Sequence, residues 1–303
     1  MTPLVHRLKP YLRWAILGGT LFFIAQTLRD HWRDVTAIQV TAQTWACLIC
    51  ALGVTLLAHI WSGWVWHWIL QSFSQPLSGT WAVQVYLKTN IAKYLPGNVW
   101  HFYGRVRAVQ ATGASAGIAL FSVLMEPLLM AAAAISLAAV SSSQIGGLQL
   151  WVLTVTLVGV HPRLFNPVLR RLGRIKAKAQ KLAEIEPTVQ LRHYPLKPLL
   201  GELGFVILRG TGFLLTVAGL LGITWEQVLP LLSAFSLAWL LGLVVPGAPG
   251  GIGVFEATAI ALLDDQFSAG LVLSSVALYR LISTLAEVGG AGLVWLDQRL
   301  SRR

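Results

Sequence analysis

Residues 229–263 read LPLLSAFSLAWLLGLVVPGAPGGIGVFEATAIALL, and this stretch decides the fold class of the chain. It is apolar enough to lie in a membrane, but a Pro-Gly-rich break at 246–251 interrupts it, and Glu256 follows five residues later. Lipid tolerates irregular backbone only where protein or a water-filled cavity satisfies its polar groups. Broken apolar segments that carry an ionisable group are typical of a polar site inside a membrane. The stretch therefore predicts a protein that binds something polar within the bilayer.

The composition of the whole chain points the same way. Hydrophobic residues make up 55% of the 303 residues and charged residues only 12%, which excludes an ordinary soluble globular protein. A span needs roughly 17–25 apolar residues, and runs of this length occur at 12–28, 45–70, 114–140, 199–221 and 271–296. A weaker sixth run at 148–169 is shortened by His161-Pro162-Arg163. We expect an all-α polytopic membrane protein of one domain, 1–303, with about six full spans and two Pro-Gly-broken helical hairpins.

The first run and the two cysteines add little to this picture. The run at 12–28 follows several basic residues, as a signal peptide does, but no small-residue cleavage site follows it. We therefore expect an uncleaved first helix. Cys47 and Cys50 form an isolated C-x-x-C inside the second run, without further cysteines or a nearby histidine cluster. This pattern favours packing residues over a metal or redox site, and we expect no metal and no cofactor.

The basic charge is distributed as the positive-inside rule requires. The net charge is +11, which on its own would be compatible with nucleic-acid binding. With the N-terminus inside, however, 19 of the 23 Lys and Arg residues fall in interior segments. The charge thus predicts cytoplasmic N- and C-termini and no nucleic acid. The basic loop at 163–197 is expected to lie on anionic headgroups of the inner leaflet, with a protein partner as the alternative.

The order of the runs indicates two halves, 1–147 and 148–303, of opposite membrane orientation. Residues 80–95 predict a short helix that breaks at Pro96-Gly97-Asn98 and resumes toward Arg105, before the span at 114–140. The second half repeats this order with the broken stretch 229–263. Inverted repeats with paired discontinuous helices are a recurrent plan of secondary transporters. Two alternatives stay open: 80–95 as an amphipathic helix lying flat on the inner surface, and 229–263 as two complete short spans.

Ionisable residues inside the apolar runs are the strongest functional signal. Each one costs roughly 2.5–3.5 kcal/mol at a helix centre, so they must converge on one another, on water or on a ligand. Such residues are Glu126, Glu202, Arg209, Glu256, Arg280 and Glu287. In one interpretation Arg209 and Arg280 only neutralise the carboxylates Glu126, Glu256 or Glu287. In the other, an arginine grips a phosphate, for which the guanidinium fork is suited, while the carboxylates orient the arginines, bind a cationic headgroup or carry protons.

Both breaks supply further candidate binding residues. Glycines at a turn expose backbone N–H groups, and a helix beginning near Ile252 would direct its positive end at the break, as an anion site requires. Lys93 and Arg105 flank the first break and would guide headgroups or remain solvated at the interface. The candidate residues of the two breaks are Lys93, Pro96, Gly97, Asn98 and Arg105, and Pro246, Gly247, Gly250, Gly251 and Gly253.

Two stretches resemble a known family. Residues 93–105 (KYLPGNVWHFYGR) and 246–256 (PGAPGGIGVFE) are similar to the signature stretches of the lysylphosphatidylglycerol synthase transmembrane family, the flippase-like membrane portion of multiple peptide resistance factor proteins. The resemblance covers nearly the whole chain in length and order, and the second stretch is the more specific. It implies movement of a lipid between leaflets, with membrane lipids as partners, and a prokaryotic inner membrane. The best-known members also carry a soluble aminoacyl-transferase domain that this sequence does not contain, so we expect no lysyl transfer.

Three functions are compatible with these observations. The leading one is a flippase or scramblase for a lipid with a phosphate-containing headgroup, and it is not an enzyme. The second is a membrane-embedded transferase that acts on a lipid-linked headgroup or sugar, with Asp264-Asp265 as its only adjacent acidic pair. The third is a non-transporting subunit of a lipid-modifying system, which would have an enzyme as its partner. A homo-oligomer is compatible with each of them.

Overall fold

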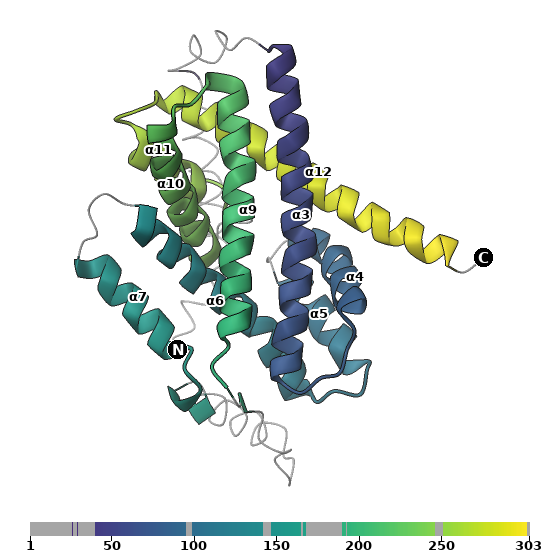
Figure 1. The fold of residues 1–303 in the computed structure, drawn as a ribbon. Coiled ribbons are helices and arrows are strands. Elements are labelled where there is room, and N and C mark those ends of the chain that lie inside the picture. The colour runs from purple at the N-terminus through teal and green to yellow at the C-terminus, as the bar shows by residue number, and fades with distance from the viewer. Residues whose placement is uncertain are drawn as a thin grey trace, which may run out of the picture.

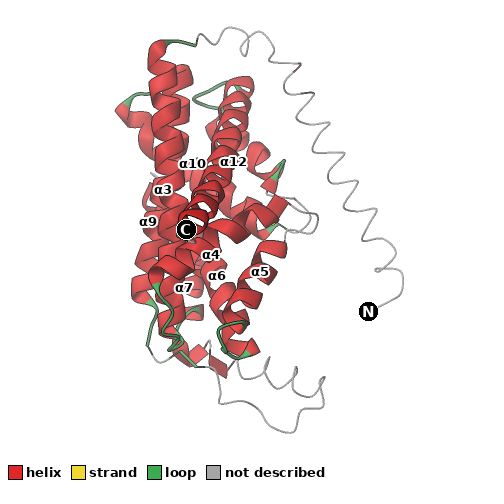
Figure 2. Cartoon of the chain, turned by 90° about the vertical axis from the view of Figure 1, so that its right-hand side faces the viewer, coloured by secondary structure: helices red, strands yellow, loops and turns green. Residues whose placement is uncertain are grey.

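The computed structural model describes residues 26, 29, 40–94, 99–141, 147–164, 166–167, 190–191, 193–245 and 251–301. The elements in these ranges are all helices (Figure 2). Five of the helices are long and apolar enough to cross a membrane, in agreement with a multi-pass membrane protein. They are α3 (Ala42–Ser72), α6 (Ala116–Ser141), α9 (Leu196–Leu221), α10 (Trp225–Val244) and α12 (Ala269–Leu300).

Shorter helices lie beside both predicted breaks. The region predicted as one short helix at 80–95 forms α4 (Gly79–Asn90) and the 3₁₀-helix η1 (Ile91–Tyr94), and α5 (Trp100–Gln110) follows the first break. The stretch at 229–263 forms most of α10 and the whole of α11 (Val254–Leu263). Pro96, Gly97 and Asn98 lie outside the described residues, as do Pro246, Gly247 and Gly250. In Figure 1, α4 and α5 lie beside the lower half of α3, whereas α10 and α11 lie beside the upper half of α9.

Two of the predicted spans have a different outcome. The first, at 12–28, lies outside the described residues except for residue 26. The weaker run at 148–169 forms α7 (Gly147–Gly159), which has 13 residues. This length is below the roughly 17–25 residues that cross a bilayer. The helix ends just before His161-Pro162, where the proline lacks the N–H that would continue the hydrogen-bond ladder.

Helices α3 and α9 have the most extensive contact among the described helices, and they lie side by side in Figure 1. Glycines of α9 make this approach possible. A Cβ atom added at Gly212 would lie 2.5 Å from Oγ1 of Thr55, and one at Gly219 would lie 2.8 Å from Cβ of Cys47. Small residues let helix backbones approach closely within membranes. The α3–α9 contact is therefore built on the glycine seam of Gly201, Gly204, Gly212 and Gly219.

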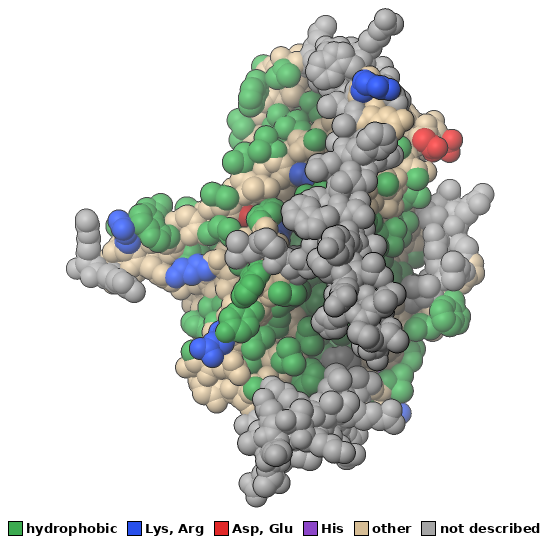
Figure 3. All heavy atoms as spheres, turned by 180° about the vertical axis from the view of Figure 1, so that it is seen from behind, with side chains coloured by type: hydrophobic (Ala, Val, Ile, Leu, Met, Phe, Trp, Pro, Cys, Tyr) green, Lys and Arg blue, Asp and Glu red, His purple; other side chains and the backbone are tan. Residues whose placement is uncertain are grey.

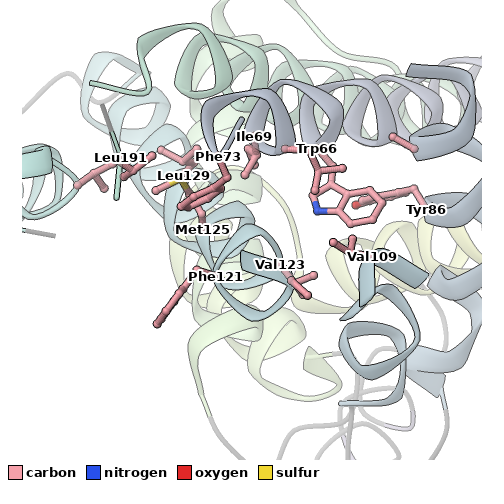
Figure 4. Close-up of a cluster of buried hydrophobic side chains, with 14 residues drawn as sticks. Trp66, Ile69, Phe73, Tyr86, Val109, Phe121, Val123, Met125, Leu129 and Leu191 are labelled. Carbon is pink, nitrogen blue, oxygen red and sulfur yellow. The ribbon is translucent and has the colours of Figure 1, made fainter. Parts of the chain in front are cut away.

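The apolar interior is divided into two main clusters. One joins α3, α4, α5 and α6 around Trp66, Ile69 and Met125 (Figure 4). The other joins α9, α10, α11 and α12 around Phe213, Phe235 and Tyr279. A smaller third cluster, with Ala58, Met130 and Phe205, lies between α3, α6, α9 and α10. The first cluster also includes Val160 and Leu191, so it extends beyond residue 147.

The outer surface is apolar as well. Large side chains in the middle of the long helices are exposed, among them Ile49, Leu57, Leu128 and Leu285. Figure 3 shows hydrophobic side chains over much of the described surface on one face, with few charges between them. A soluble monomer rarely exposes so much contiguous apolar area, whereas lipid solvates it without cost. The exposed apolar faces agree with a multi-pass membrane protein.

Candidate functional site

The charged side chains inside the helical bundle are balanced in number. Among the described residues, four cations and four carboxylates lie in or against the interior. The cations are Lys93, Arg105, Arg209 and Arg280, and the carboxylates are Glu126, Glu202, Glu256 and Glu287. All four carboxylates are at most 3% exposed. Unpaired charges at this depth are strongly destabilising, so their partners decide what the site can do.

The first ion pair joins the helix after the first break to the next long helix. Arg105 on α5 donates to Glu126 on α6 with a 2.5 Å Nη1–Oε2 distance, and it is 1% exposed. The hydroxyl of Tyr86 on α4 donates to the other oxygen of Glu126 at 2.8 Å, and the guanidinium of Arg105 stacks 3.7 Å from the centroid of the Tyr86 ring. Ser62 on α3 donates in turn to the Tyr86 hydroxyl at 2.8 Å. Figure 4 shows Tyr86 beside Trp66 at one end of the apolar cluster.

The second ion pair occupies the equivalent place in the second half. Arg280 on α12 contacts Glu256 on α11 with a 2.6 Å Nε–Oε1 distance, and its Nη2 donates to the carbonyl of Gly251 at 3.0 Å. Glu256 also accepts a 2.6 Å hydrogen bond from the backbone N–H of Gly253, the residue that caps α11. The positive end of α11, predicted to hold an anionic ligand, is therefore occupied by a carboxylate of its own first turn.

The two pairs are related by topology. In each half, the helix that follows the break is linked by a buried ion pair to the long helix that comes next, α5 to α6 and α11 to α12. The charges are exchanged: the arginine is on the shorter helix in the first half and on the long helix in the second.

A third cluster joins the two halves. Lys93 on η1 contacts Glu287 on α12 with a 2.5 Å Nζ–Oε1 distance, and Nε2 of His59 on α3 lies 3.2 Å from the same oxygen. Ser283, one turn before Glu287, donates to it at 3.4 Å. The cluster therefore connects a helix beside the first break to the last helix of the chain. Lys93, for which the sequence left a headgroup contact or a solvated position open, is half-buried in this ion pair.

Arg209 is the cation of this cluster that has no carboxylate of its own. Its Nη1 donates to Ser283 at 2.6 Å and lies 3.1 Å from Nε2 of His59, and no described carboxylate lies within 4.0 Å of it. Its Nε atom has no hydrogen-bond partner among the described residues, although the side chain is only 8% exposed. Lys93 and Arg209 thus place two positive charges around the single carboxylate of Glu287. A guanidinium with spare donors in such a site is suited to a phosphate or carboxylate.

The carboxyl of Glu202 is the counterpart of Arg209. It is fully buried on α9, and neither of its oxygens has a hydrogen-bond partner in the described part of the chain. Glu202 and Arg209 are seven residues apart, which is two turns of one helix face, or about 10 Å along the axis. Of the eight interior charges, the two without an ion pair are therefore on the same face of α9.

The structure brings together most of the predicted residues that it describes. Glu126, Glu256, Glu287, Arg105, Arg280 and Lys93 form three ion pairs, and Arg209 joins the third. Gly251 and Gly253 contact the Arg280–Glu256 pair through their backbones. Sequence reasoning missed His59, Ser62, Tyr86 and Ser283. Helical spacing could have found them, because His59 and Ser62 are one turn apart on α3, and Ser283 and Glu287 are one turn apart on α12.

A surface hollow lies apart from these charges. It has a volume of about 550 Å³ between the end of α3 and the start of α9, and its lining includes Trp61, Trp68, Tyr194 and Lys197. The ammonium of Lys197 lies 4.6 Å from the centroid of the Trp68 ring. Most of the basic loop at 163–197 that precedes it lies outside the described residues.

No group of three or more His, Cys, Asp or Glu side chains in the described ranges is arranged to hold a metal ion. The sequence matches no known family profile and no curated protein.

Proposed function

We propose that this chain moves a lipid with a phosphate-containing headgroup between the two leaflets of a prokaryotic inner membrane. The observation that carries the proposal is Arg209, a buried guanidinium whose Nε has no partner and which has no carboxylate of its own among the described residues. It shares the neighbour His59 with the Lys93–Glu287 pair. The resemblance of residues 93–105 and 246–256 to the lysylphosphatidylglycerol synthase transmembrane family supports the same function.

The surroundings of Arg209 favour a passage for a headgroup rather than a static charge pair. The cluster draws its residues from α3, η1, α9 and α12, so it lies where both halves of the chain meet. In transporters built from two inverted halves, the substrate binds at this junction near mid-membrane. The apolar outer faces of the helices would let the acyl chains remain in lipid while the headgroup moves inside.

The residues have distinct roles in this mechanism. Arg209 binds the phosphate through its guanidinium. Lys93 supplies a second positive charge, which interacts with both the phosphate and Glu287. Ser283 and His59 position the Arg209 guanidinium from two different helices. The Arg105–Glu126 and Arg280–Glu256 pairs hold α5 and α11 against the long helices.

The first experiment reconstitutes the purified chain into sealed vesicles that contain labelled phosphatidylglycerol, phosphatidylethanolamine or a polyprenyl phosphate. A membrane-impermeant quencher then reports which labels change leaflet. Protein-dependent movement of lipids with one headgroup class supports the proposal and identifies the class. If no lipid moves with or without a proton gradient, the proposal is wrong, and a transferase or a partner-dependent subunit becomes the better hypothesis.

Variants of Arg209 test the proposed role directly. Loss of a charged hydrogen-bonding group costs about 1.5–3 kcal/mol, which is roughly 10- to 100-fold in rate or affinity at 1.4 kcal/mol per tenfold. We expect Arg209→Gln to slow lipid movement by this factor and Arg209→Lys to restore only part of it, because an ammonium lacks the planar fork. Arg107→Gln is the matched control, since Arg107 is exposed on α5. Equal rates in all three variants would contradict the role of Arg209.

A further inference from the structure

Glu202 is buried under conditions that a carboxylate does not tolerate. It is 0% exposed, and both of its side-chain oxygens lack a hydrogen-bond partner among the described residues. An ionised carboxylate that is removed from water without a partner costs many kcal/mol, and such a group becomes neutral instead. Gly201 beside it packs on Val65 and Trp68 of α3. The geometry is therefore that of a protonated acid.

The charges that act on Glu202 come from the first ion pair. They are those of Glu126 on α6 and Arg105 on α5, and the phenol of Tyr86 on α4 also interacts with Glu202. Helices α3, α10 and α12 pack against α9 as well. The ionisable side chains that α3 and α12 direct inward are His59 and Glu287, which belong to the Lys93 cluster, Tyr279, which donates to the carbonyl of Arg209, and Arg280, which pairs with Glu256. Glu226 at the start of α10 is exposed. Arg105 is therefore the cation whose charge acts on Glu202, and it already forms an ion pair with Glu126.

We infer that Glu202 is a proton-binding site, and that the proton on Glu202 and an anionic headgroup at Arg209 bind together. The coupling between the proton and the headgroup rests on the proposed function. With Glu202 protonated, the described interior carries four positive and three negative charges, so one positive charge at Arg209 lacks compensation. One phosphate monoanion restores neutrality. When Glu202 loses its proton, the described interior carries four positive and four negative charges without a ligand, so the proton on Glu202 and the anion at Arg209 favour each other.

The proton follows a simple chemical cycle in this scheme. A proton from water forms an O–H bond on the Glu202 carboxylate, which becomes a neutral acid and releases Arg105 entirely to Glu126. Loss of the proton breaks that O–H bond, returns the proton to water and restores a negative charge that competes with Glu126 for Arg105. Because Arg105 is on the helix that follows the first break, this competition acts on the position of α5. Protonation of Glu202 thereby alters the first half of the molecule, which contributes Lys93 to the headgroup site.

Infrared spectroscopy tests the proton site without any lipid substrate. A protonated carboxylic acid has a C=O stretching band that is distinct from the bands of a carboxylate and of an amide. We expect the purified wild-type chain to show this band at neutral pH and Glu202→Gln to lack it. Glu256→Gln is the control and should keep the band, because Glu256 is ion-paired with Arg280. If the Glu202→Gln spectrum retains the whole band, Glu202 is not the proton site and the inference is wrong.

Glu202→Gln is also a conservative test of folding. Glutamine has the shape of a protonated glutamate, so the variant should elute as the wild type does in gel filtration and unfold at a similar temperature. If this variant is unstable, Glu202→Asp provides a second measurement. Its carboxylic band should shift rather than disappear, since the acid is retained in a different place. An unchanged band in Glu202→Asp would assign the band to another residue.

Proton uptake on ligand binding tests the coupling. Short-chain phosphatidylglycerol is added to the detergent-solubilised chain in weakly buffered solution with a pH indicator, at a pH high enough to remove the infrared band of the lipid-free wild type. We expect the wild type to take up about one proton for each lipid bound, and Glu202→Gln to bind the lipid without proton uptake. Equal uptake by both proteins would overturn the coupling. If wild type binds no phosphatidylglycerol at all, the coupling and the proposed function both fail for this headgroup, while the infrared result still decides the proton site.

Discussion

Arg105 and Arg107 are two residues apart on α5, but their surroundings are opposite. Arg105 is buried between Glu126, Tyr86 and Thr89, whereas Arg107 is exposed. Removal of one partner from a buried ion pair leaves the other charge uncompensated and costs about 3–5 kcal/mol. An exposed charge contributes little, typically within 0.5 kcal/mol. The side of α5 on which an arginine lies, rather than its residue type, decides how much it contributes to the free energy of unfolding.

We therefore expect Arg105→Gln to lower the free energy of unfolding by about 3–5 kcal/mol and Arg107→Gln to leave it nearly unchanged. Denaturant or thermal unfolding of both variants in the same detergent, followed by circular dichroism, would measure the difference. The double variant Arg105→Gln/Glu126→Gln should recover part of the loss, because it removes both charges. Equal losses in the two single variants would mean that the Arg105–Glu126 pair does not support the fold.

The ionisable residues of the site could be identified from the sequence, but not their partners. Glu126, Arg209, Glu256, Arg280 and Glu287 stand out because each interrupts an apolar run. Which arginine meets which carboxylate depends on how the helices pack, and periodicity within one helix carries no such information. For Arg105 the sequence left open a headgroup contact or a solvated position. The residue is buried instead, since Glu126 on the next helix faces it.

At the scale of elements, the turn before α11 depends on the absence of side chains. Gly251 has a φ of +72°, and a Cβ atom at this position would lie 2.9 Å from the Cα of Gly242 on α10. The carbonyl of Gly251 also accepts a hydrogen bond from Arg280. This turn thus brings α10, α11 and α12 into mutual contact within a few residues.

Gly251→Ala should consequently destabilise the protein. The left-handed conformation alone costs an L-residue about 1–2 kcal/mol, and the contact with Gly242 adds to this. Gly289→Ala on α12 is the control, because a Cβ atom there meets nothing within 4 Å and φ is helical. Alanine should stabilise that helix by up to about 1 kcal/mol. Unfolding temperatures of the two variants should therefore move in opposite directions, and a shift in the same direction would contradict this reading of the turn.

The sequence predicts the helices themselves well, because composition and length suffice to identify a span. The runs at 45–70, 114–140, 199–221 and 271–296 correspond to α3, α6, α9 and α12, with ends a few residues apart. The run at 148–169, the weaker sixth one, is shortened before His161-Pro162 as the sequence predicts, and α7 has 13 residues. The hydropathy of a segment does not reveal where the backbone ladder stops, and the proline was the better signal.

At the scale of the whole molecule, the distribution of Lys and Arg predicts the sidedness of the loops. The loop after α3 should face the cytoplasm, and the loop between α11 and α12 should face the exterior. We expect Asp265→Cys to react with a membrane-impermeant maleimide in intact cells, and Ser74→Cys to react only after permeabilisation. Both positions are exposed, and the background would carry Cys47→Ala and Cys50→Ala. Labelling of Ser74→Cys in intact cells would reverse the predicted orientation.

The glycine seam between α3 and α9 has a mechanical consequence for any such protein that changes shape. Because the backbone of α9 packs directly against side chains of α3, the two helices cannot rotate or slide past each other without steric clashes. The α3–α9 pair would then act as a stationary frame, against which the other helices are displaced. Its inner face carries His59, Ser62, Glu202 and Arg209, so the proton site and the anion site would keep a constant separation while the opposing walls move. Because this distance stays fixed through the cycle, the charge at the proton site acts electrostatically on the anion site in every state.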